Sequence, residues 1–237
     1  GMAATVSVGA DGTPWVVDGQ NHGIWEYVSA WTSVGPYGFS FTSGGTAGTY
    51  SGEIHDVAVS AGGGEVIAGA TGGGVWQNQT GTPSGWVAIG DVGAGVTAQG
   101  QALQPGPNMS VGTVAIKPND ATTLIVGTGA SGSLNSSTNQ YGNGIWYTTN
   151  AVSYPVVWSQ AWCDSQYNPC PSPVVKIRYS ADSTKIYAAT KTRLYVGSQT
   201  GNVISFTSAC STNNEFTDLV VDPNNASTVW LGVAHEG

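Results

Sequence analysis

The sequence predicts an all-β fold, a β-propeller of four-stranded blades, from three observations. A four-strand pattern begins five times along the 237 residues, and its fifth copy stops after two strands. The composition combines 35 glycines and 9 tryptophans with only 8% charged residues, which suits tight turns and aromatic packing between sheets. No stretch has the 3.6-residue periodicity of an amphipathic helix, so helix content should be near zero. Repeated groups of four short strands are typical of a propeller.

Each unit opens with two short apolar strands joined by a turn. The first strands are expected at residues 6–8, 57–59, 114–116, 177–179 and 219–221. The second strands are expected at residues 15–17, 67–69, 124–127, 186–188 and 229–232. The third unit has the turn Pro118-Asn119-Asp120 where the fifth has Pro223-Asn224-Asn225. This correspondence strengthens the evidence for a structural repeat.

The third strand has the pattern glycine, aliphatic residue, tryptophan. It occurs at residues 23–25, 74–76 and 144–146, with 193–195 as the weakest copy. The fourth strand is expected at residues 31–35, 86–90, 157–158 and 203–206. Because Trp25, Trp76 and Trp146 recur at one strand position, we expect them to pack between blades rather than to bind a ligand.

These strands predict one propeller domain, residues 1–237, with about four and a half to five blades. The units span approximately residues 5–35, 53–91, 111–160, 174–207 and 216–237. Residues 36–52 are expected to form a link, 92–110 a surface loop and 129–143 a long insert within the third unit. The incomplete last unit would leave a sheet edge and an apolar face uncovered. We expect the natural polypeptide to continue beyond Gly237 into a larger ring, seven-bladed for example; the alternative is that the N-terminal strands complete the last blade.

Charge and composition exclude several classes of partner. With a net charge of −8 and six Lys plus Arg, the chain has no basic surface for nucleic acid. No apolar run approaches the roughly 20 residues that a membrane span needs, so membrane insertion is not expected. Low charge with abundant Ser, Thr, Asn, Gly and Trp favours a secreted or extracellular protein. No metal-ligand spacing or cofactor motif occurs, so we expect neither a metal nor a cofactor.

The three cysteines allow one small disulfide loop. Cys163 and Cys170 flank a short polar, proline-containing segment and are predicted to pair. The alternative is that both remain free thiols, like Cys210.

The repeats resemble those of the Asp-box (BNR) β-propellers, the superfamily that includes sialidases, sortilin-like domains and xyloglucanase-type glycoside hydrolases. The resemblance is carried by residues 66–76, 86–91, 114–146 and 217–232. The first unit, around residues 8–15, is closer to tectonin-type lectin repeats. The Asp-box itself has lost its acidic residue here, since Thr148-Thr149-Asn150 and Asn78-Gln79-Thr80-Gly81 stand in its place. In the superfamily these boxes are structural turns.

The resemblance raises the question of catalysis on carbohydrate. Sialidases of this superfamily grip the substrate carboxylate with three arginines, whereas this chain has only Arg178 and Arg193. Glycoside hydrolysis needs two facing carboxylates. Asp56 and Asp218 stand at equivalent places, each directly before a first strand, and are the candidate catalytic pair. The alternative is that both bond backbone amides at the strand start. His55 should point away from Asp56, because neighbours on a strand face opposite sides.

Four aromatic residues outside the repeated pattern are the candidate ligand contacts, because an exposed ring can stack on the apolar face of a sugar. They are expected in loops: Trp162, Tyr167, Tyr37 and Tyr141.

The sequence therefore supports three hypotheses. The first is a secreted binding module that recognises carbohydrate or another cell-surface ligand without catalysis. The second is a xyloglucanase-like glycoside hydrolase segment that uses Asp56 and Asp218. The third is a protein-protein interaction scaffold.

Overall fold

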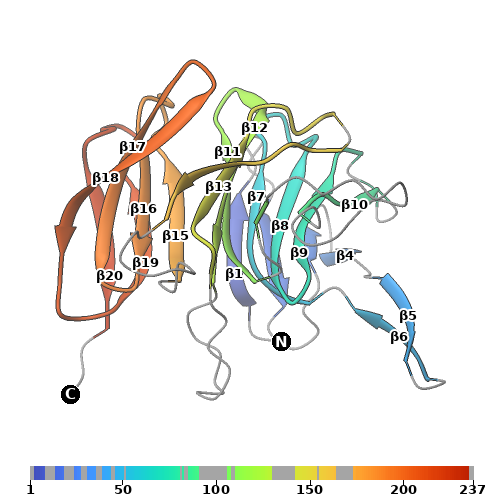
Figure 1. The fold of residues 1–237 in the computed structure, drawn as a ribbon. Coiled ribbons are helices and arrows are strands. Elements are labelled where there is room, and N and C mark those ends of the chain that lie inside the picture. Colours follow the sequence, from blue (N-terminus) through green and yellow to red (C-terminus); the bar gives the residue numbers. More distant parts are fainter. Residues whose placement is uncertain are drawn as a thin grey trace, which may run out of the picture.

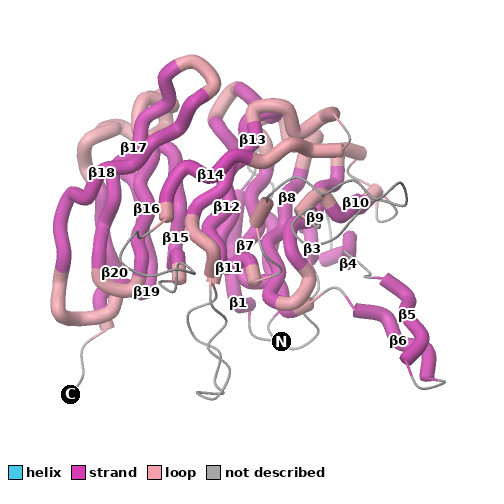
Figure 2. Tube along the Cα trace, viewed as in Figure 1, coloured by secondary structure: helices cyan, strands magenta, loops and turns pink. Residues whose placement is uncertain are grey.

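The computed structural model describes the strands up to residue 50 and most of the chain beyond it. The described ranges are 3–8, 14–18, 24–27, 31–35, 39–43, 46–50, 52–80, 82, 85–90, 106–107, 110–129, 142–153, 155–163 and 173–234. These residues form strands, turns and loops without a helix (Figure 2). The predicted all-β class is therefore confirmed.

Four four-stranded antiparallel sheets and one two-stranded sheet follow one another along the chain, and each is a propeller blade. Blade 1 consists of β1 (Ala3–Val8), β2 (Pro14–Asp18), β3 (Ile24–Tyr27) and β4 (Trp31–Gly35). Blade 2 consists of β7 (Glu53–Val59), β8 (Val66–Thr71), β9 (Gly74–Asn78) and β10 (Trp86–Ala88). Blade 3 consists of β11 (Val111–Lys117), β12 (Asp120–Thr128), β13 (Ile145–Thr148) and β14 (Ser159–Trp162). Blade 4 consists of β15 (Val174–Tyr179), β16 (Ile186–Thr190), β17 (Arg193–Thr200) and β18 (Val203–Ser211), and blade 5 of β19 (Phe216–Val221) and β20 (Val229–Val233).

The first strands of consecutive blades contact one another, so they form the inner side of the arrangement. In Figure 1, blades 2 to 5 follow one another from cyan to red, and the blue strands of blade 1 lie behind those of blade 2. A separate hairpin, β5 (Phe39–Ser43) with β6 (Thr46–Tyr50), lies between blades 1 and 2 in the sequence. The sequence pattern missed this hairpin, because its Ser, Thr and Gly residues look like a link.

In blades 2, 3 and 4, alternating residues of the second strand face opposite neighbouring blades. In β12, Leu124 and Val126 belong to the core shared with blade 2, whereas Ile125 belongs to the core shared with blade 4. All three side chains are completely buried. The blades are thus held face to face by apolar side chains, as period-two alternation in a sheet buried on both sides requires. Trp76 and Trp146 are buried in these cores, as predicted; the side chain of Trp25 lies outside the described residues.

Every inner strand has a β-bulge near its start. In the register with the second strand, one residue is skipped just before Thr5, Asp56, Thr113, Lys176 and Asp218. These five residues are therefore equivalent in the repeat. Because a bulge adds an unpaired residue, it interrupts the alternation of side chains. His55 is the skipped residue of its strand, so simple alternation does not apply to it, and the expectation that it points away from Asp56 stays a prediction.

The fourth strand of blade 3 lies later than predicted. It begins at Ser159, and the predicted pair Val157 and Trp158 precedes it. Trp158 is buried against blade 2, where its Nε1 donates a hydrogen bond to the carbonyl of Ile89 at 2.9 Å. Its apolar character reflects this packing and not a strand. Trp162, predicted in a loop, ends the strand instead.

The connections between strands divide between two faces of the molecule. Because consecutive strands are antiparallel, first-to-second and third-to-fourth connections lie on one face, and second-to-third and blade-to-blade connections lie on the other. The second face receives the longest connections, namely the segments between β4 and β7, β10 and β11, β12 and β13, and β14 and β15. We call it the long-connection face; it is the lower side in Figure 1.

Candidate functional site

Asp56 lies in β7, inside the inner strand and not before it as predicted. Its side chain is completely buried. The Thr113 hydroxyl donates to Oδ2 at 2.7 Å, and the backbone amide of Val114 donates to the same oxygen at 3.1 Å. Both donors come from β11, the inner strand of the next blade.

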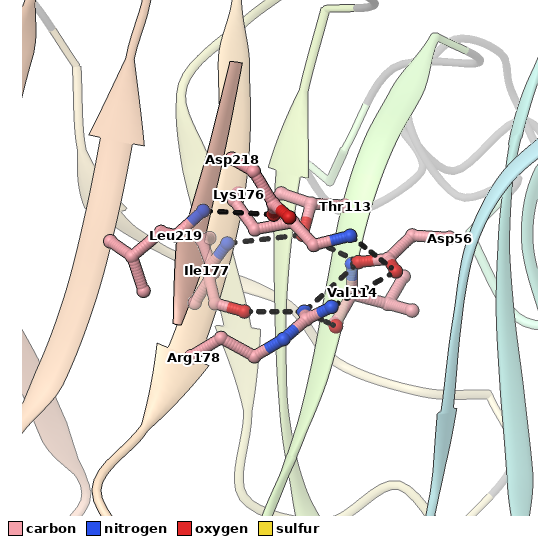
Figure 3. Close-up of polar contacts among 8 residues, drawn as sticks. All are labelled: Asp56, Thr113, Val114, Lys176, Ile177, Arg178, Asp218 and Leu219. Atoms are coloured by element: carbon pink, nitrogen blue, oxygen red, sulfur yellow. Dashed lines mark hydrogen bonds and ion pairs between the residues drawn. The ribbon is translucent and has the colours of Figure 1, made fainter. Parts of the chain in front are cut away.

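Two cations from β15, one blade further on, complete the bonding of Asp56. Lys176 Nζ lies 3.0 Å from Oδ1, and the Arg178 guanidinium places Nη1 3.1 Å from Oδ2 and Nη2 3.3 Å from Oδ1. Figure 3 shows both side chains reaching across to the carboxylate. One aspartate therefore joins the inner strands of three consecutive blades, and both of its oxygens are occupied.

The electrostatics keep Asp56 ionised. Burial by itself would raise the pKa of this carboxyl group, but the charges of Arg178 and Lys176 and the hydrogen bonds from Arg178 and Thr113 outweigh it and lower the pKa to about 2. Burial would likewise lower the pKa of Arg178, and the charge of Asp56, with a smaller contribution from Asp218, raises it instead.

The same contact repeats from blade to blade. The amide that follows the bulge position donates to the side chain at the bulge position of the preceding blade: Val114 to Asp56, and Ile177 to Thr113 at 3.1 Å. The series ends at Lys176, because an ammonium group cannot accept a hydrogen bond from the amide of the next blade. The amide of Leu219 is bonded instead by Oδ1 of its own neighbour Asp218 at 2.8 Å (Figure 3).

This geometry does not support the catalytic role predicted for Asp56. A general acid needs a raised pKa, and a nucleophile or base needs access to substrate. Asp56 has a lowered pKa and no exposed surface. Asp218 is exposed, but it bonds the amide of Leu219. Both contacts match the alternative that these aspartates bond backbone amides, and the equivalence of the two positions is as predicted.

The three partners of Asp56 were not predicted as a site. Thr113, Lys176 and Arg178 lie 57, 120 and 122 residues beyond it. The available signal was positional, since a polar residue stands at the bulge position of every unit and an apolar residue directly follows it. Aligning the units on their first strands would have brought Asp56, Thr113, Lys176 and Asp218 together.

Of the predicted ligand contacts, only Trp162 lies within the described residues. It is half-buried at the end of β14, and its ring centroid lies 4.6 Å from that of Tyr195 in the next blade, with the planes tilted by 53°. Tyr37, Tyr141 and Tyr167 lie outside the described residues. Cys163, directly after Trp162, is disulfide-bonded, and Cys210 is an exposed free thiol. Cys170 lies outside the described residues, so the pair of Cys163 with Cys170 stays a prediction.

Within the described ranges, no group of three or more His, Cys, Asp or Glu side chains could hold a metal ion. The same residues contain no helix with the length and apolarity needed to cross a membrane.

Comparisons with known proteins match the fold and not a family. No family model matches the sequence, and no curated protein matches it. Among solved structures, the β-propeller domain of Cps50 (Swd1) from Myceliophteria thermophila superposes with a TM-score of 0.58 at 13% identity, over 98% of this chain and 62% of that one. A GH74 enzyme from Niastella koreensis superposes with a TM-score of 0.65 at 14% identity, over 97% of this chain and 33% of that one.

A protein of unknown function from Desulfotomaculum acetoxidans gives a TM-score of 0.54 at 11% identity, over 95% of this chain and 61% of that one. The chain thus spans less than two thirds of each of these structures. At such low identities the likeness concerns the fold alone, and together with the blade topology it identifies the chain as a β-propeller.

Proposed function

We propose that the protein is a secreted β-propeller binding module that recognises carbohydrate through its long-connection face, without catalysis. The observation that carries the proposal is Trp162. This indole is half-buried at the end of β14 on that face, and it packs against Tyr195. A ring fixed in this way loses little conformational freedom on binding, and indoles offer a flat apolar surface to a sugar.

The other predicted ligand residues belong to connections of the same face. Tyr37 falls between β4 and β5, Tyr141 between β12 and β13, and Tyr167 between β14 and β15. The strands that flank these connections end or begin on the long-connection face. Loops presented by a rigid scaffold are where binding residues usually lie. We therefore propose that these three tyrosines share one face with Trp162.

The absence of catalysis in this proposal rests on Asp56. Its charge is fully used in joining three blades, so one member of the candidate catalytic pair has a structural task. The superposition with a GH74 enzyme concerns the fold only. Membership of the Asp-box superfamily, which would agree with a secreted carbohydrate-binding protein, remains part of the proposal.

A polysaccharide panel tests this function. Affinity electrophoresis in gels containing soluble plant, fungal and bacterial polysaccharides should show retardation of the parent protein by at least one of them. Trp162→Ala should lose the retardation, and Trp162→Phe, which keeps a ring, should retain part of it.

Trp86→Ala is the matched control. Trp86 is also half-buried, but it begins β10 on the opposite face, so its removal should leave the retardation unchanged. Migration of the parent that no polysaccharide changes, or equal loss in the two alanine variants, would contradict the proposal.

A further inference from the structure

Blade 5 exposes a sheet face whose equivalents in the other blades are buried. Trp230 in β20 pairs with Val220 in β19. By register from the bulge, Trp230 corresponds to Trp15, Ile67, Ile125 and Tyr187 in the second strands of blades 1 to 4. Those four side chains are 3%, 1%, 0% and 4% exposed, whereas Trp230 is 65% exposed.

The difference follows from what covers each position. Trp15 belongs to the core shared with blade 2, Ile67 to the core shared with blade 3, Ile125 to the core shared with blade 4, and Tyr187 to the core shared with blade 5. The opposite face of blade 5 follows the same rule, because Phe216 and Leu219 pack against blade 4. Val220, which pairs with Trp230 and is 54% exposed, extends the open apolar surface around it. Exposed apolar surface of this kind marks an interaction site.

Asp218 gives this surface a polar anchor. Its position in blade 5 is equivalent to that of Asp56 in blade 2. There Asp56 accepts hydrogen bonds from the Thr113 hydroxyl and the Val114 amide and forms ion pairs with two cations. Among the described residues, the hydrogen bond that Asp218 accepts comes from the backbone amide of its neighbour Leu219, and its side chain is exposed. An occupant that repeated the Asp56 arrangement would bring a hydroxyl or basic side chain and a backbone amide to this carboxylate.

We propose that the face formed by Asp218, Val220 and Trp230 is a docking surface for a further propeller blade. Its occupant is an antiparallel sheet that covers Trp230 with apolar side chains, as blade 2 covers Trp15 with Ala68 and Ala70. The inner strand of that sheet carries Ser, Thr, Lys or Arg opposite Asp218. A second copy of this same face is a poor occupant, because a twofold contact would bring two Asp218 carboxylates together in a chain of net charge −8.

An extended chain tests the surface directly. A second copy of residues 173–211, which is blade 4, is joined after Gly237. By the repeat, the added copy of Lys176 would lie opposite Asp218. The backbone amide of the added copy of Ile177 would donate a hydrogen bond to the Asp218 carboxylate, as the amide of Val114 does to Asp56. Thermal unfolding followed by circular dichroism should show the Tm of the extended chain about 5 to 10 °C above that of the parent, because a large aromatic side chain becomes buried.

The dependence on Trp230 distinguishes docking from unspecific stabilisation. Trp230→Lys should remove most of the gain in the extended chain and change the Tm of the parent by less than about 2 °C, since exposed sites tolerate substitution. Trp230→Ser, a milder change, repeats the comparison. Val203→Lys is the control, because Val203 is 62% exposed on blade 4 and should leave both Tm values unchanged.

Two results would overturn the proposal. One is an extended chain without a gain in Tm, or with a gain that survives both substitutions of Trp230. The other is a parent protein that dimerises in sedimentation velocity and becomes monomeric with Trp230→Lys, because the occupant would then be a second copy of the chain.

Discussion

Asp56 shows how a buried charge can serve the fold. Removing a carboxylate from water is costly, and the cost is offset only when opposite charges and hydrogen-bond donors surround it. Here two cations, one hydroxyl and one amide do so. The donors come from two segments, β11 and β15, that are far from Asp56 in the sequence, so the carboxylate fixes the relative position of blades 2, 3 and 4.

Replacing Asp56 by Asn should therefore destabilise the protein and make it less sensitive to acid. At pH 7 we expect a loss of about 3 kcal/mol in the free energy of unfolding, because Lys176 and Arg178 lose their buried counter-charge. The folded-state pKa of Asp56, about 2, lies below its ordinary value of 3.8. Its stabilising contribution is thus fully present above about pH 5 and is lost as the pH falls through 3.8 towards 2, amounting to about 2 kcal/mol.

Urea unfolding of the parent and of Asp56→Asn at pH 7 and at about pH 2.5 measures both effects. The difference in the free energy of unfolding between the parent and Asp56→Asn should be large at pH 7 and smaller at about pH 2.5. Glu215→Gln, which removes the charge of an exposed pair with Lys191, is the control and should change little. An Asp56→Asn variant as stable as the parent at pH 7 would refute the structural role of the ion pair.

The candidate residues could be predicted only in part from the sequence. The repeat showed that Asp56 and Asp218 are equivalent, because equivalence is a matter of position along the chain. Their tasks depend on Lys176 and Arg178, which approach Asp56 only because blades 2 and 4 flank blade 3. No local pattern around Asp56 contains that information.

At the scale of the element, a small residue lies opposite the bulge in blades 2 to 5, whereas Val17 takes this place in blade 1. Gly69, Gly127 and Gly232 pair with Asp56, Thr113 and Asp218, and Ala189 takes this place in blade 4. A Cβ atom on Gly127 would lie 2.6 Å from Cβ and Cγ1 of Val174. The small residue thus lets the next blade approach closely.

Gly127→Ala should for this reason destabilise the protein by about 1 to 3 kcal/mol, the usual cost of overpacking a core. Gly62→Ala is the control, since a Cβ there would meet nothing within 4 Å. The measurement is the midpoint of urea unfolding for the two variants. Equal midpoints for Gly127→Ala and the parent would show that blades 3 and 4 are not packed this closely.

Element boundaries show which sequence signals can mislead. Strand existence was predicted well wherever apolar residues alternate, as in the first two strands of every unit. The fourth strand of blade 3 was misplaced because Trp158 is apolar for a different reason, its burial against blade 2. The β5–β6 hairpin was missed because it lacks an apolar alternating pattern. Pairing between main chains leaves little trace in side-chain composition.

At the scale of the whole molecule, the propeller separates stability from binding. Apolar cores between the blades and the Asp56 cluster hold the inner strands, whereas the long connections leave the blades on one face. Asp56 belongs to the scaffold in this division, and our proposal gives Trp162 to the ligand. Binding and cleavage of a polysaccharide are thus separable outcomes.

The most direct test of this account is to incubate the protein with the polysaccharide that retards it in affinity gels and to measure the release of reducing ends. The account predicts binding that depends on Trp162 and no release above a protein-free blank. Release of reducing ends by the parent that disappears in Asp56→Asn, while the folded variant still binds, would contradict it.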